Sequence, residues 1–138
     1  MLERYCDAVV PAVDTEAALR AEFAGLFERL DDLLSRAELS AALEQIWQHV
    51  RRLNRYVEEN APWALARDAA RAAELEAVLA SLAEGLRVVT VALLPYMPSK
   101  TAQLLDALGC RERTERAFAA RGWGARVSAL APLFPKPA

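Results

Sequence analysis

The chain has 138 residues, 54% of them hydrophobic and only five of them glycine, a composition that favours one all-α domain over a disordered or all-β chain. Its net charge of −2 argues against broad, sequence-blind binding to nucleic acid, DNA included, because such binding needs a basic surface. Two cysteines far apart, Cys6 and Cys110, form neither a disulfide framework nor a metal site, and this fits a reduced, cytoplasmic protein. The most apolar run, residues 88–94, is far shorter than the roughly 20 residues that cross a bilayer, so no membrane span is expected.

The first residues have the pattern of a helix end. Leu2 and Tyr5 are three apart, and Pro11 ends the segment. A helix of one or two turns is unstable alone in water. We therefore interpret residues 1–6 as the end of a longer helix truncated at Met1.

Three apolar stripes of helical period predict the long helices of an antiparallel bundle. We expect the first helix from a cap at Asp14 or Thr15 to about residue 35, the second from a cap at Ser40 or slightly before it, and the third from about residue 70. The stripes consist of Leu19, Phe23, Leu26, Leu30 and Leu33; of Leu43, Ile46, Trp47, Val50, Leu53 and Val57; and of Leu75, Val78, Leu79, Leu82, Leu86, Val89 and Leu93. The period assigns Trp47 to the core.

Shorter elements follow a proline break. Pro95 and Pro98 end the third long helix, and Ser99 is expected to cap a short helix that Gly109 stops. A last helix is expected over residues 112–121. We therefore expect a helical domain over 1–121 and an irregular tail over 122–138, and the absence of alternating patterns predicts no sheet.

The residues for self-contained catalysis are missing. His49 is the only histidine, no Glu-x-x-His pair occurs, and there is no glycine-rich phosphate loop. We interpret His49 as a surface or half-buried helix residue. Neither a catalytic residue nor a bound cofactor is expected in this chain.

The segment from Asn54 to Trp63 is the most informative one. The second long helix must end near Pro62, because a proline disfavours the helical conformation of the residue before it, and Ala61 is expected to be extended. Trp63 then lies just past the helix end, where a flat aromatic either covers a core or offers a stacking surface to an RNA base.

This segment resembles the C-terminal anticodon-binding domain of methionine–tRNA ligases, which are class I aminoacyl-tRNA synthetases. The landmarks, in order, are Arg4-Tyr5-Cys6-Asp7 with Val9-Val10-Pro11; Ala42-Leu43-Glu44 with Ile46-Trp47 and Val50; Asn54-Arg55-Tyr56-Val57 with Ala61-Pro62-Trp63; Leu82-Ala83-Glu84; Leu94-Pro95-Tyr96-Met97-Pro98; and Trp123-Gly124 with Pro132-Leu133-Phe134-Pro135-Lys136. They cover nearly the whole chain, and the Asn-Arg-Tyr…Ala-Pro-Trp element is the most specific.

The resemblance implies a helix bundle that reads the CAU anticodon of methionine tRNAs. In the family, the tryptophan at the position of Trp63 stacks on an anticodon base, and part of the cytosine selection comes from an asparagine and an arginine upstream of Met1. Pro62 is expected to fix the corner, Asn54 to hydrogen-bond the backbone there, and Arg55 either to reach phosphate or to stay solvated. We name these four residues as candidate RNA contacts.

The resemblance also implies a catalytic domain that this chain lacks. That domain would bind ATP and magnesium and attach methionine to its tRNA. The tail would fold back on it, with Trp123 and Phe134 pinning the tail or docking on the catalytic body.

Two other functions remain open from the sequence. One is a stand-alone paralogue that binds tRNA without aminoacylation. The other is a helical protein-interaction bundle in which Trp63 belongs to the core, which the acidic composition favours. Absence of RNA binding at low salt, together with a dimer in solution, would favour this last interpretation.

Overall fold

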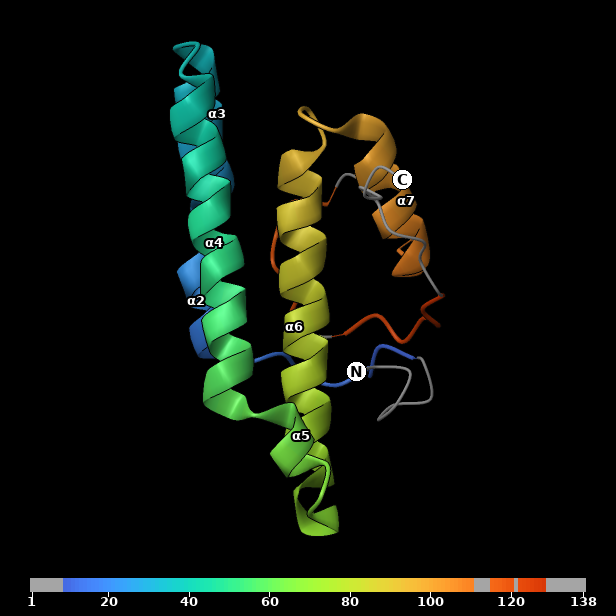
Figure 1. Cartoon of the computed structure of the whole chain (residues 1–138). Helices are drawn as coiled ribbons and strands as arrows, with labels where there is room; N and C mark the ends of the chain where they lie inside the picture. Colours follow the sequence, from blue (N-terminus) through green and yellow to red (C-terminus); the bar gives the residue numbers. More distant parts are fainter. Residues whose placement is uncertain (1–8, 111–114, 121, 129–138) are drawn as a thin grey trace, which may run out of the picture.

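The computed structural model describes residues 9–110, 115–120 and 122–128, and its elements are helices joined by short connections (Figure 1). The two long helices, α4 (Leu39–Asn60) and α6 (Ala72–Leu93), lie antiparallel and in contact. In the described ranges there is no strand, only an isolated antiparallel bridge between Val9 and Arg126. The predicted all-α antiparallel bundle is therefore confirmed.

The first stripe forms two helices instead of one. These are α2 (Ala17–Phe23) and α3 (Leu26–Ser35), with Gly25 between them in the left-handed region at φ 78°. Glycine adopts this conformation without the penalty that a Cβ brings, so the helix can break there. The predicted cap is also wrong, because the Thr15 hydroxyl donates to the carbonyl of Ala119 (2.7 Å) and α2 begins two residues later.

Helix α4 is the amphipathic helix that the second stripe predicts, but two of its residues lie where they were not expected. Trp47, assigned to the core, has 41% of its surface exposed. It points about 100° away from the buried Ile46, because successive residues of a helix are rotated by that angle. His49, expected at the surface or half-buried, is buried against the Phe23 ring, with ring centroids 4.9 Å apart.

Helix α6 is the central helix of the bundle. It follows a short 3-10 turn, η1 (Ala69–Arg71), and ends before Pro95 as predicted. It packs against α4, α5 (Pro62–Leu65), η1 and α7 (Pro98–Ala107), so most of its circumference is buried. At Gly85 a Cβ would overlap the Leu53 side chain, and the glycine therefore permits the close approach of α4 and α6. Leu86, from the predicted stripe, is partly exposed.

The elements after the proline break agree only in part with prediction. Helix α7 begins with Pro98 at its first position instead of after a cap at Ser99, and it ends before Gly109, whose φ is 73°. The predicted helix over 112–121 is wrong for residues 115–120, which are irregular and lie along α6. Residues 1–8, 111–114, 121 and 129–138, including the predicted helix at 1–6 and Phe134, lie outside the described residues.

The two ends of the described chain run side by side. Backbone hydrogen bonds join the amide of Thr15 to Ala120, that of Gly122 to Val13 and that of Val10 to Ala125, at 2.9 to 3.0 Å. The Trp123 indole N–H donates to the carbonyl of Leu108 (3.0 Å), as expected for a residue that pins the tail. Within the described residues, no helix has both the length and the apolar character that crossing a membrane requires.

Candidate functional site

The candidate site is the corner between α4 and α5. Helix α4 ends at Asn60, and Ala61 turns the chain with φ 42° and ψ 67°, a left-handed conformation. The expectation that Ala61 is extended is therefore wrong. The ring of Pro62 excludes the right-handed helical region for Ala61, and the left-handed turn lets Pro62 start a new helix at once.

Hydrogen bonds and apolar anchors hold this corner. The amide of Ala61 donates to Val57 (2.9 Å), that of Ala66 donates to Pro62 (2.9 Å), and the Asn60 side-chain amide donates to the carbonyl of Tyr56 (2.9 Å). Pro62 and Leu65 are both buried, and α5 packs on α6. Because these anchors lie three residues apart on one side of a single turn, they fix the direction of the residues between them.

Trp63 lies between the two anchors and faces solvent, with 47% of its surface exposed. The alternative in which Trp63 belongs to the core is therefore wrong. An exposed indole on a turn fixed by Pro62 and Leu65 is available for stacking, and little of its backbone order would have to be gained on binding.

Asn54 does not have the role that was expected for it. Its side chain is exposed and forms no hydrogen bond with the described residues, whereas Asn60 makes the backbone contact at the corner. Tyr56, two residues after Asn54, buries its ring in the core. Its hydroxyl lacks a hydrogen bond within the described structure, and burial is the main cause that raises the pKa of Tyr56 above its ordinary value.

Two guanidinium groups lie near Trp63 in the chain. Arg55, on the last turns of α4, and Arg67, four residues after Trp63, are exposed, and neither forms an ion pair with the described residues. Arg67 was not singled out from the sequence, although its position four residues after Trp63 could have indicated a cation near the exposed indole. Both cations remain available to an anionic ligand.

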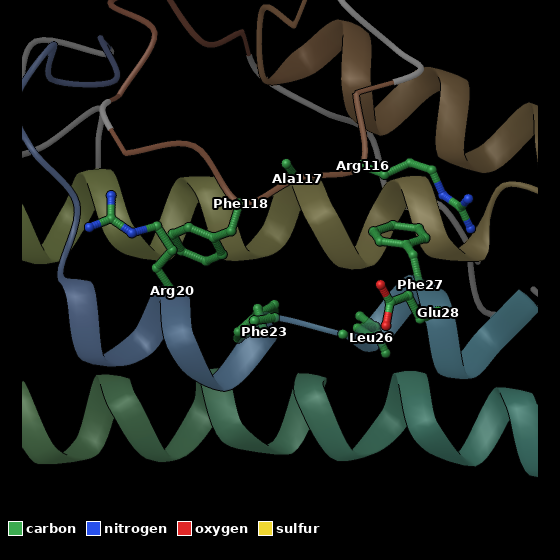
Figure 2. Close-up of a pocket in the computed structure, with 10 residues that line it drawn as sticks. Arg20, Phe23, Leu26, Phe27, Glu28, Arg116, Ala117 and Phe118 are labelled. Atoms are coloured by element: carbon green, nitrogen blue, oxygen red, sulfur yellow. The ribbon is translucent and has the colours of Figure 1, made fainter.

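A second feature, missed in the sequence, is a shallow pocket of about 330 Å³ where α2 gives way to α3 (Figure 2). Phe23, Phe27 and Phe118 are the three aromatic side chains that line it. The Arg116 guanidinium lies over the Phe27 ring (4.3 Å) and pairs with Asp31, which lowers the pKa of that carboxyl. The pocket depends on the helix break at Gly25, which the apolar period did not indicate.

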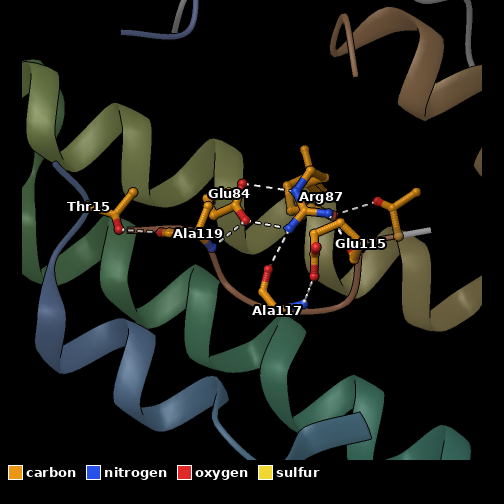
Figure 3. A network of polar contacts seen from close by, with 8 residues as sticks. Thr15, Glu84, Arg87, Glu115, Ala117 and Ala119 are labelled. Carbon is orange, nitrogen blue, oxygen red and sulfur yellow. Dashed lines mark hydrogen bonds and ion pairs between the residues drawn. The ribbon is translucent and has the colours of Figure 1, made fainter. Parts of the chain in front are cut away.

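A third feature is a buried polar cluster on α6 (Figure 3). Arg87 donates to the Glu84 carboxylate (2.5 and 2.9 Å) and to the carbonyls of Glu115 (2.6 Å) and Ala117 (2.8 Å), while Glu84 also accepts the amide of Ala119 (2.8 Å). These contacts hold residues 115–119 against α6. We assign the cluster a structural role, because the charged side chains of Glu84 and Arg87 are both buried and paired with each other.

Comparison with known proteins gives consistent matches. The chain is 35% identical to a methionine–tRNA ligase from Deinococcus radiodurans and 33% identical to one from Clostridium acetobutylicum, over 99% of its length in both cases but only 21% and 22% of theirs. It matches the crystal structure of the free Mycobacterium tuberculosis methionyl-tRNA synthetase with a TM-score of 0.85 and 26% identity, over 100% of this chain and 30% of that one. No family model matches the chain.

Proposed function

We propose that the bundle of this chain, which belongs to the methionine–tRNA ligase family, binds the anticodon loop of methionine tRNAs with Trp63 as a stacking surface. The chain spans 21% and 22% of the length of two curated relatives. The observation that carries the proposal is the exposed indole on an anchored corner. A base stacked on it would gain about 1–3 kcal/mol.

Charge supports the same surface. The chain is acidic as a whole, with a net charge of −2, so contacts to phosphate must be local. Arg55 and Arg67 are exposed cations near Trp63 in sequence, and we assign them to backbone phosphates. Stacking tolerates any base, so selection of the CAU anticodon requires hydrogen bonds to base edges. Asn54, exposed on the outer side of α4, is the candidate for one of them.

The reaction itself is assigned to a part of the enzyme outside this chain. In that proposal the rest of a methionine–tRNA ligase binds ATP and magnesium and joins methionine to the tRNA in the cytoplasm, while the bundle selects the tRNA. In the described residues, no three His, Cys, Asp or Glu side chains gather as a metal site would need.

The test is binding of this chain to anticodon stem-loop RNAs of methionine tRNA at low and moderate salt. Trp63→Ala should weaken binding roughly 5- to 150-fold, the equivalent of 1–3 kcal/mol. Trp47→Ala is the matched control, because Trp47 is exposed to a similar extent (41%) on another part of the bundle, and it should bind like the unmodified chain.

Two results would contradict the proposal. One is equal loss of binding in both tryptophan variants, which would indicate a non-specific effect. The other is equal affinity for a CAU loop and for a loop with a different anticodon. The second result would instead favour a general tRNA-binding bundle.

A further inference from the structure

The pocket at the break between α2 and α3 brings three aromatic rings together. Its volume of about 330 Å³ is at the lower end of the range for small-ligand pockets. Phe23 and Phe118 meet edge to face, with ring centroids 5.2 Å apart and 62° between the ring planes. Phe27 lies at the other end of the pocket from Phe118 (Figure 2). A flat ring placed between these side chains can stack on them or meet them edge to face.

Two small residues keep the pocket open. Ala24 and Gly25, between α2 and α3, line it and are exposed, and neither has a side chain larger than a methyl group. Phe27 and Phe118 are half-buried, so part of each ring reaches solvent. A small molecule can therefore enter the pocket without displacing any part of the core.

The two arginines of the pocket differ in whether they are already paired. Arg116 lies over one face of Phe27 (4.3 Å) and binds the Asp31 carboxylate (2.7 and 3.0 Å). Arg20 of α2 is half-buried and forms no ion pair with the described residues. Its guanidinium is available to a carboxylate, which it can bind through two parallel hydrogen bonds.

The opposite end of the pocket has a negative charge. Glu28, exposed in the first turn of α3, lies beside Phe27, at the end away from Arg20 (Figure 2). A second anionic group on a ligand would face this carboxylate and be repelled. The pocket therefore has one end that attracts an anion and one end that disfavours it.

We propose that this pocket binds a small aromatic monocarboxylate, with its ring between Phe27 and Phe118 and its carboxylate on Arg20. One arginine without an ion pair in the described structure matches one negative charge, and three rings match an aromatic body. The proposal does not depend on RNA binding, because no residue of the corner between α4 and α5 lines the pocket.

The same features disfavour other small ligands. A phosphate monoester carries roughly two negative charges, as a dicarboxylate does, and Arg20 matches only one of them. Glu28 would repel the second charge of an elongated dianion. An aliphatic carboxylate can pair with Arg20, but it lacks the ring quadrupole that favours edge-to-face contact with the phenylalanines.

Titration of the 138-residue chain with 2-naphthoate, followed by NMR, tests the proposal. The resonances of Phe27 and Phe118 should shift in a saturable way, and nuclear Overhauser effects should connect both rings to the naphthoate protons. A ligand of this size that gains the usual free energy per atom has a Kd of roughly 1 mM. Naphthalene-2-methanol, which has no charge, cyclohexanecarboxylate, which has no aromatic ring, and naphthalene-2,6-dicarboxylate, which has a second charge, should each bind more weakly.

Two arginine variants test the charge. Arg20→Gln removes the cation without breaking an ion pair of the described structure, and it should raise the Kd for 2-naphthoate about tenfold. Arg29→Gln is the matched control, because Arg29 is exposed close to Gly25 but does not line the pocket, and it should leave the Kd unchanged. Glu28→Gln should strengthen binding of the dicarboxylate more than that of 2-naphthoate.

Each other outcome overturns the proposal. Absence of saturable shifts, or shifts centred away from Phe27 and Phe118, would show that 2-naphthoate does not bind there. An unchanged Kd in Arg20→Gln, or an equal loss in Arg29→Gln, would show that Arg20 does not hold the carboxylate. Equal affinity for naphthalene-2-methanol would make the pocket apolar without preference for an anion. Amide spectra that match outside the pocket confirm the fold of each variant, and the Trp63 RNA assay reports separately on the proposed function.

Discussion

The buried pair of Glu84 and Arg87 gives the most direct prediction about stability. Arg87→Met removes the guanidinium but keeps most of the side-chain volume. The Glu84 carboxylate, 0% exposed, would then keep only the amide of Ala119, and the carbonyls of Glu115 and Ala117 would lose their donor. Leaving one buried charge without its partner costs about 3–5 kcal/mol. This is a large part of the roughly 5–15 kcal/mol that stabilises a typical domain.

Unfolding in guanidinium chloride, followed by tryptophan fluorescence and circular dichroism, measures this loss of unfolding free energy. The matched control is Arg71→Met, because Arg71 also pairs with a glutamate three residues away, Glu74, but in an exposed position (2.8 Å). We expect the control to cost far less than Arg87→Met, because both groups of the Arg71–Glu74 pair are exposed and water screens their attraction. A double variant, Glu84→Leu with Arg87→Met, should cost less than the sum of the two single variants, because both charges leave the interior together.

A loss for Arg87→Met no larger than that for Arg71→Met would refute the reasoning, because it would show that the Glu84 carboxylate is not buried when its partner is absent. Hydrogen exchange of the Ala119 amide gives an independent measurement. It should accelerate in Arg87→Met even under conditions where the rest of the bundle stays folded, since residues 115–119 are held by this cluster.

Three further outcomes are expected. Gly25→Ala should destabilise the chain by about 1–2 kcal/mol in chemical unfolding, because φ is 78° there, and an unchanged midpoint would show that the helix break relaxes. Burial raises the pKa of the Cys110 thiol to about 11 from 9.0. Between these values the thiol ionises in the unfolded chain but not in the folded one, so the stability that it contributes is complete below pH 9 and is lost as the pH rises towards 11. In chemical unfolding, Cys110→Ala should therefore show a smaller decline of the free energy of unfolding over that interval. Trp63→Phe, which keeps an aromatic face, should bind stem-loop RNA more tightly than Trp63→Ala, and equal affinities would count against stacking.

The sequence predicts those parts of the fold whose signals are local. The end of α6 before Pro95 and the end of α7 before Gly109 follow from backbone restrictions of proline and glycine. The corner at Pro62 follows for the same reason, although the left-handed turn of Ala61 does not, because the proline only excludes one conformation and leaves several.

Features that depend on distant partners could not be predicted in this way. From the sequence alone, Glu84 and Arg87 have the spacing of an ion pair on the surface of a helix. Their burial depends on residues 115–119, which lie over them although their sequence favours a helix. His49 is buried because Phe23 of α2 lies against it, a contact that helical period alone does not specify. In both cases the partner lies more than twenty residues away in the chain.

The two exposed tryptophans illustrate why exposure alone does not identify a function. Trp47 lies on α4 between Glu44, three residues before it, and Arg51, four residues after it, and these two side chains form an ion pair with each other. Trp63 is the outward residue of a turn whose other side is buried, and exposed arginines lie near it in sequence. A phosphate beside Trp47 would have to compete with Glu44 for Arg51, whereas Arg55 and Arg67 near Trp63 form no ion pair with the described residues. The loss of RNA affinity expected for Trp63→Ala and the unchanged affinity expected for Trp47→Ala therefore test whether this difference in surroundings decides which exposed ring binds RNA.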